Sequence, residues 1–142
     1  MLNNCAMQYV VVDTNVMVSA LLAKDISSSV PFSILAAVFS GKITPIVSKA
    51  ILNEYALVLN REKFGFDKNK IRVLLSEFEK LSLKIIPSES GVQLPDAKDV
   101  CFYNVAFAYK DYDVILVTGN MKHFPNCNFA MTPSQLKEKL GL

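Results

Sequence analysis

The stretch that most constrains the fold is a run of three valines that ends abruptly in polar residues. Val10, Val11 and Val12 are followed directly by Asp13, Thr14 and Asn15. Consecutive β-branched residues without polar alternation are typical of a strand that is buried on both faces, as in parallel sheets. We therefore expect a central strand with a carboxylate at its carboxyl end, which is where open α/β sheets bind ligands.

The rest of the chain alternates short apolar strands with amphipathic helices. Strands are predicted at 43–47, 83–86 and 114–117, with an edge strand at 128–131, and Pro45 suggests that the 43–47 strand lies at an edge or ends there. Helices are predicted at 16–23, at 31–40, and after the capping residues Ser48, Asp67, Asp99 and Thr132. This alternation predicts an α/β fold with a mainly parallel sheet.

Composition limits the classes of protein that this chain can belong to. With 142 residues, 51% hydrophobic and 20% charged, the sequence predicts a single globular domain over 7–142, preceded by a short tail at 1–6. The net charge of +2 indicates no global basic field. No apolar run approaches the roughly 20 residues of a membrane span. Three widely spaced cysteines fit a reducing cytoplasm, and Met7 is an alternative start.

Acidic and amide side chains recur at the ends of the predicted elements. Glu54 lies in the second turn of the helix after the 43–47 strand, on the flank of its apolar stripe. Asp96 and Asp99 stand before and at the start of a later helix, and Asn120 follows the 114–117 strand much as Asp13 follows the first. Because ligands gather at the carboxyl ends of parallel strands, these residues are candidates for one shared site.

A group of carboxylates such as Asp13, Glu54 and Asp99 requires a compensating charge. Carboxylates in one crevice repel each other strongly unless a cation lies between them. Oxygen ligands of this kind suit Mg²⁺ or Mn²⁺ rather than zinc. Such an ion keeps part of its water shell and meets a substrate phosphate. The pattern therefore indicates metal-assisted hydrolysis of a phosphodiester.

Each of these residues also has an ordinary structural interpretation, which the sequence leaves open. Glu54 is compatible with a solvated helix face, and Asp99 with a helix N-cap. Asn120 suits a turn. His123, the only histidine, is expected to cover the loop after the 114–117 strand rather than to act in catalysis. The basic residues of the two middle helices are typical of a solvated face.

Taken together and in order, four segments resemble the PIN-domain family, in particular the VapC-like ribonuclease toxins of toxin–antitoxin systems. The resemblance runs from about Met7 to the C-terminus. Its segments are Val10–Val16, Ile46–Ser48 followed by Glu54, Asp96–Asp99, and Ile115–Asn120 followed by His123–Pro125.

The resemblance implies a three-layer, Rossmann-like α/β/α sandwich and a ribonuclease that depends on Mg²⁺ or Mn²⁺. Asp13, Glu54 and Asp99 would be the catalytic, metal-binding acids. Where the family often has a fourth acid, this chain has Asn120, which removes one negative charge. The residues expected to support the acids are Asn15, Ser48, Thr118, Asn120 and Asp96.

The partners expected of such an enzyme are RNA and an inhibitory protein. RNA would cross the carboxyl ends of the strands, where the nearby basic residues Lys49, Arg61 and Lys122 would meet its backbone. An antitoxin should cover the crevice if cellular RNA is the target, and the family implies a homodimer. The enzyme would work in the cytoplasm, without a membrane partner.

Two other classes of function remain open from the sequence. An aspartyl phosphatase of the haloacid-dehalogenase type also places Asp after its first strand, but it normally has a second Asp where this chain has Asn15. The other alternative is a catalytically degenerate PIN fold that is retained as an RNA-binding or protein-binding module, in keeping with Asn120 and the modest net charge.

Overall fold

A five-stranded parallel sheet in the order β3-β2-β1-β4-β5 forms the middle of the fold. The computed structural model describes residues 7–142, so the tail expected at 1–6 lies outside the described residues. The valine run lies in the central strand β1, as predicted. The strands are β1 (Gln8–Val12), β2 (Ile43–Val47), β3 (Leu83–Lys84), β4 (Ile115–Val117) and β5 (Ala130–Met131).

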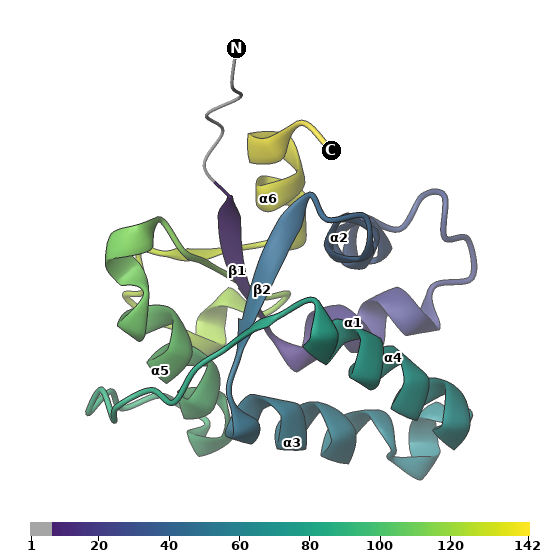
Figure 1. The fold of residues 1–142 in the computed structure, drawn as a ribbon, viewed down its shortest axis with the longest axis horizontal. Coiled ribbons are helices and arrows are strands. Elements are labelled where there is room, and N and C mark those ends of the chain that lie inside the picture. Colours follow the sequence, from purple (N-terminus) through teal and green to yellow (C-terminus); the bar gives the residue numbers. More distant parts are fainter. Residues whose placement is uncertain (1–6) are drawn as a thin grey trace.

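Helices cover both faces of this sheet, which confirms the predicted three-layer α/β/α sandwich. Helix α5 packs against β1, β2 and β4, while α2 packs on both α1 and α6, and α3 packs on α4. Figure 1 shows α5 on one side of the sheet and α1, α2 and α4 on the other. The helices are α1 (Thr14–Leu22), α2 (Val30–Phe39), α3 (Lys49–Leu59), α4 (Lys68–Lys80), α5 (Val100–Ala108) and α6 (Pro133–Leu140).

Capping residues fix where several helices begin, as the sequence predicts. Ser48 Oγ accepts a hydrogen bond from the backbone N–H of Ile51 at the start of α3, and Asp67 caps α4 in the same way. Thr132 and Gln135 form a reciprocal capping box at the start of α6, which ends at Gly141 with a φ of 66°. A left-handed residue at this position favours glycine.

The prediction that Pro45 marks an edge or an end of its strand is wrong. Strand β2 lies between β1 and β3, and Pro45 pairs with Val10 of β1. Strand β3 is only two residues long and begins opposite Ile46. At the level of Pro45, β2 therefore has a strand neighbour on one side only, and the missing N–H is tolerated there. The predicted strand at 83–86 is correspondingly shorter than expected.

The core is fully buried around the carboxyl half of β1. Val10, Val11 and Val12 have no exposed surface, and Tyr55 of α3 and Phe102 of α5 are also buried. None of the helices between residues 7 and 142 has the length and apolar character that crossing a membrane requires.

Candidate active site

The central position of β1 places Asp13 at the carboxyl edge of the sheet. The strand ends at Val12, and the backbone N–H of Asp13 donates to the carbonyl of Val117 in β4, at 3.0 Å. Helix α1 then begins at Thr14, which turns the chain away from the sheet. The Asp13 side chain is left in a crevice between β1 and β4 with only 4% of the residue exposed.

A hydrogen-bond network holds the Asp13 carboxylate in one orientation. Its Oδ2 atom accepts from Thr118 Oγ1 at 2.7 Å and from Asn15 Nδ2 at 3.1 Å. The Asn15 Oδ1 atom accepts from the backbone N–H of Gly119 at 3.0 Å. The structure thus brings three of the sequence-predicted residues into direct contact.

Asp99 reaches the same region from the start of α5. It closes a short 3₁₀ turn at Ala97–Asp99, is 8% exposed, and makes no hydrogen bond to the backbone N–H groups of the helix. Asp96 is the residue that caps this turn, through the N–H of Lys98 at 2.9 Å. The interpretation of Asp99 as a plain N-cap is therefore wrong.

His123 lies between Asp99 and Asn120. Its Nδ1 atom is 3.0 Å from Asp99 Oδ2, and its Nε2 atom is 2.9 Å from Asn120 Nδ2. An amide N–H donated to Nε2 leaves the ring proton of a neutral imidazole on Nδ1, facing Asp99. The expectation that His123 merely covers the loop is thus too simple, because its ring contacts one of the candidate acids.

The two aspartates act on each other electrostatically. Burial raises the pKa of the Asp13 carboxyl above its ordinary value, although hydrogen bonds from Thr118 and from the backbone N–H groups of Thr14 and Asn15 lower it. Burial, followed by the negative charge of Asp13, raises the pKa of Asp99 to about 6, while His123 opposes the shift. The fold therefore holds two carboxyl groups close together in a poorly solvated crevice, where both resist ionisation.

Glu54 lies nearby on α3 but is less constrained. It is half-buried, and no residue in 7–142 donates a hydrogen bond to its carboxylate. The pKa of the Cys101 thiol is raised to about 12, first by burial and then by the negative charge of Glu54, with smaller effects from Asp99 and Asp13. Cys101 in the first turn of α5 thus lies within electrostatic reach of all three acids.

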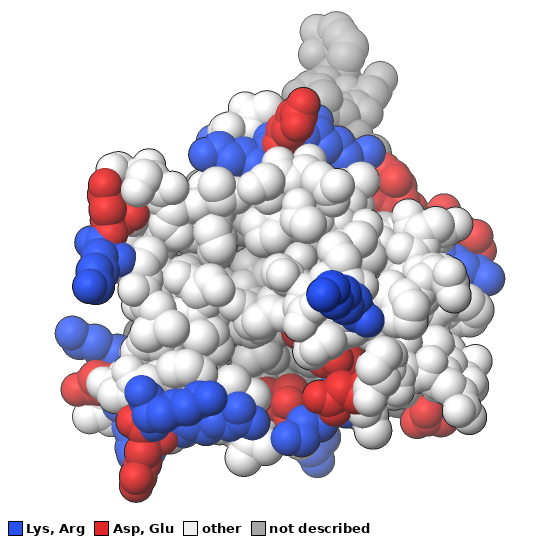
Figure 2. Space-filling view, turned by 180° about the vertical axis from the view of Figure 1, so that it is seen from behind, with Lys and Arg blue, Asp and Glu red and all other residues white. Residues whose placement is uncertain are grey.

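The predicted basic residues are exposed and lie at different distances from this crevice. Lys49 opens α3, directly after the buried Ser48, and Lys122 belongs to the turn Met121–His123. Arg61 follows the far end of α3, about 16 Å along the helix axis from its start. Figure 2 shows acidic side chains gathered in the lower middle of one face, next to basic side chains along the lower edge.

Tyr55 and Cys101 belong to this neighbourhood, although neither residue is predicted to do so from the sequence. The Tyr55 hydroxyl, fully buried, donates to the carbonyl of Val12, the residue just before Asp13. A tyrosine in an apolar helix stripe is a usable signal, because a buried hydroxyl must find an acceptor. For Cys101, the sequence feature that indicates a place near the acids is its position two residues after Asp99.

The donor set fits a hard divalent cation, although it is only partly assembled. Asp99 Oδ2 is buried, and within residues 7–142 its close polar neighbour is His123 Nδ1 at 3.0 Å. A buried carboxylate with so few partners, beside a second buried carboxylate, offers oxygen ligands that a bound cation would use. In the same part of the chain, however, no three His, Cys, Asp or Glu side chains converge closely enough to hold an ion.

Comparison with known proteins agrees with this architecture. The PIN domain family matches residues 9–122, so the chain belongs to that family. An uncharacterized protein of the archaeon Methanocaldococcus jannaschii is 33% identical over 114 residues, which cover 78% of this chain and 70% of the relative. No solved structure matches the chain. PIN domains are generally nucleases that use divalent metals, so the fold is of a nuclease type.

Proposed function

We propose that this chain is a metal-dependent endoribonuclease that hydrolyses RNA phosphodiesters with Mg²⁺ or Mn²⁺. The observation that supports it best is the pair of buried carboxyl groups of Asp13 and Asp99, each with a raised pKa, at the carboxyl edge of the sheet. Two buried carboxyl groups that repel each other are costly to a fold unless a cation offsets their charge. Membership in a family of nucleases supplies the reaction class.

In this proposal Asp13 and Asp99 hold the ion, and Glu54 accepts the proton of the attacking water. A bound divalent ion supplies Lewis-acid activation of water and offsets the charge that develops on the phosphate. Thr118 and Asn15 keep the Asp13 carboxylate from rotating away. The further supporting residues are Ser48, which fixes the start of α3, Asp96, which fixes the turn before Asp99, and Asn120, which orients His123.

The same proposal includes the partners of the enzyme. Lys49 and Lys122 are exposed beside the crevice and would contact the RNA backbone. Arg61 would contact the same RNA molecule at a phosphate farther from the cleaved one. We further propose that the chain is the toxin of a toxin–antitoxin pair in the cytoplasm, with an antitoxin over the crevice and a homodimer as its working form.

The test is cleavage of a pool of labelled RNAs with Mn²⁺ or Mg²⁺, beside a chelator control and the Asp13→Asn variant. The proposal expects cleavage that requires both the metal and Asp13. Cleavage that persists in Asp13→Asn, or in the chelator, would show that another centre does the chemistry. A folded protein that neither cuts RNA nor binds Mn²⁺ would overturn the proposal.

A second candidate function is a catalytically inactive PIN fold that binds RNA or protein. It is favoured by the lack of a converged three-ligand group in residues 7–142 and by Asn120, whose amide is engaged with His123. Melting temperature separates the two functions, because a ligand stabilises the folded state that binds it. A rise with Mn²⁺ that Asp13→Asn abolishes favours the enzyme, whereas no rise favours the module.

A further inference from the structure

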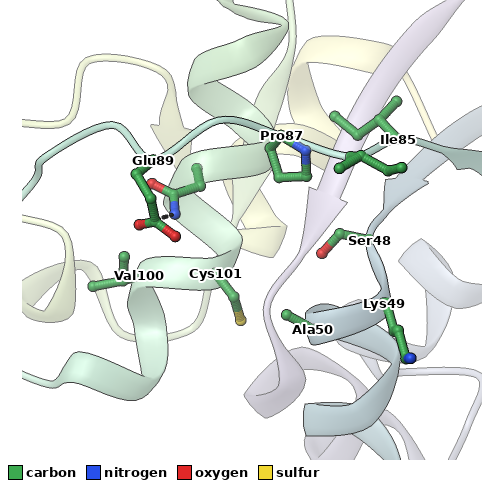
Figure 3. Close-up of a pocket in the computed structure, with 10 residues that line it drawn as sticks. Ser48, Lys49, Ala50, Ile85, Pro87, Glu89, Val100 and Cys101 are labelled. Carbon is green, nitrogen blue, oxygen red and sulfur yellow. Dashed lines mark hydrogen bonds between the residues drawn. The ribbon is translucent and has the colours of Figure 1, made fainter.

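A cavity of about 300 Å³ lies beside the candidate active site, between the first turns of α3 and α5. Figure 3 shows its walls, which come from the β2–α3 junction, from the segment that follows β3, and from α5. Ile85, Pro87 and Val100 supply apolar surface, and Glu89 supplies a carboxylate. This size is at the lower end of small-molecule pockets and suits one flat ring system.

Two lining residues join the cavity to the acids. Ser48 stands at the carboxyl end of β2, the strand next to β1 and Asp13. Cys101 lies two residues after Asp99 on α5, and the charges of Glu54, Asp99 and Asp13 all act on its thiol. A ligand in the cavity would therefore lie at the same edge of the sheet as a phosphate held at the acids.

Glu89 is fixed on the cavity wall by a buried asparagine. Asn104 of α5 is 7% exposed, and its Nδ2 atom donates to Glu89 Oε2 at 3.3 Å, the contact dashed in Figure 3. Its Oδ1 atom accepts from the Ser90 backbone N–H at 3.1 Å and from Ser90 Oγ at 2.6 Å. A buried amide on a helix that otherwise packs with apolar residues thus serves to hold this segment and its carboxylate in place.

The chemistry of the cavity selects its ligand. Lys49 also lines the cavity, but its amine points away from Glu89 (Figure 3). At the Glu89 end a phosphate is disfavoured, because Glu89 would repel it and the apolar walls there would leave its oxygens unpaired. A carboxylate only accepts hydrogen bonds, and no residue in the described part of the chain donates to Glu89 Oε1. Guanine presents two adjacent donors, N1–H and the N2 amino group, on its Watson–Crick edge. On the Watson–Crick edges of adenine, cytosine and uracil, each hydrogen-bond donor lies next to an acceptor atom. A carboxylate oxygen facing that acceptor would be repelled.

We propose that this cavity binds one guanine base of single-stranded RNA, next to the phosphate that is cleaved. The base stacks against Ile85, Pro87 and Val100 and donates N1–H and N2–H to Glu89. Reading an unstacked base by its Watson–Crick edge is how proteins achieve sequence specificity on single-stranded RNA. This inference rests on the proposed ribonuclease function and adds a sequence preference to it.

The experiment measures binding of labelled uridine hexamers that contain one central guanosine, inosine or 7-deazaguanosine, by fluorescence anisotropy with a chelator present. Inosine lacks the N2 amino group, whereas 7-deazaguanosine keeps the Watson–Crick edge. We expect guanosine and 7-deazaguanosine to bind alike and inosine about tenfold more weakly. Equal binding of guanosine and inosine would overturn the inference.

Two variants separate this contact from a general effect on RNA binding. Glu89→Gln should reduce the preference for guanosine over inosine to less than about threefold, because an amide presents one acceptor and one donor. Glu138→Gln is the matched control, since it removes the same charge on α6, at the end of the molecule opposite the strand carboxyl ends (Figure 1). A preference that survives Glu89→Gln would overturn the inference.

Metal-dependent behaviour distinguishes failure of this inference from failure of the proposed function. If Mn²⁺ stabilises the protein and the RNA pool is cut without regard to guanosine, the cavity does not read this base but the nuclease function stands. If no hexamer binds and Mn²⁺ has no effect on the melting temperature, both proposals fail. Because the base analogues are tested on the unmodified protein, the result does not depend on the variants folding.

Discussion

Replacing the buried Asp99 by asparagine should make the metal-free protein more stable at neutral pH. In the folded chain the pKa of Asp99 is about 6, raised from 3.8 by burial and by the charge of Asp13. At about 1.4 kcal/mol per pKa unit, ionising this group in the fold opposes stability by at most ~3 kcal/mol at pH 7. The partly solvated edge of the site screens part of this cost, so we expect a gain of about 1–2 kcal/mol.

The pH dependence of this gain has a definite sign. A carboxyl whose pKa is higher in the folded than in the unfolded chain contributes stability while protonated, and that contribution is lost as the pH rises through about 6. An asparagine at this position does not titrate, so the advantage of the Asp99→Asn variant over the unmodified protein should be small near pH 4 and grow towards pH 7. The substitution forfeits no helix cap, because the Asp99 side chain makes none.

Urea denaturation of the metal-free protein, in a chelator and at several pH values between about 4 and 8, measures this free energy. Asp111→Asn is the matched control, because Asp111 is an exposed acid in the turn that follows α5. Mn²⁺ should then stabilise the unmodified protein but not Asp99→Asn. A variant that is less stable than the unmodified protein at pH 7 would refute the argument that unrelieved charge repulsion is stored at this site.

Three further substitutions test other parts of the site. Tyr55→Phe leaves the Val12 carbonyl without its donor and should lower the free energy of unfolding by about 1–2 kcal/mol in urea titrations, without altering the pH dependence described above. Ser48→Ala removes the cap of α3 and should cost about 1 kcal/mol, most of which Ser48→Asn should restore; an equal loss in both variants would contradict the capping role. Asn120→Asp adds a negative charge beside His123 and Asp99 and should tighten Mn²⁺ binding severalfold by calorimetry, whereas an unchanged affinity would show that this position faces away from the ion.

Features governed by neighbours in sequence were predictable. The valine run identifies the central strand because β-branched residues bury well on both faces of a sheet. Ser48, Asp67 and Thr132 mark helix starts through hydrogen bonds that close within three residues. The contact between Asp13 and Thr118 was also within reach, since parallel strands end at the same edge and both residues follow buried runs.

Features that depend on distant parts of the chain were not predictable in this way. The tolerance for Pro45 depends on where β3 begins, some forty residues later in the chain. The contact of His123 with Asp99 depends on how the turn after β4 folds back over the start of α5, and no local periodicity encodes that. The buried Asn104 gave no sequence signal, because its partners Glu89 and Ser90 lie in an irregular segment.

The separation of Asp13 and Thr118 along the chain has a consequence for synthesis. The hydrogen bond between them spans 105 residues, and β1 pairs in parallel with β4, so the crevice cannot close before the fourth strand has left the ribosome. Pairings of this kind form late in folding, because the long intervening loop must be closed first. A nascent chain that ends before β4 would expose Asp13 on an incomplete sheet. Any activity of this site is therefore withheld until β4 has been made and has paired with β1.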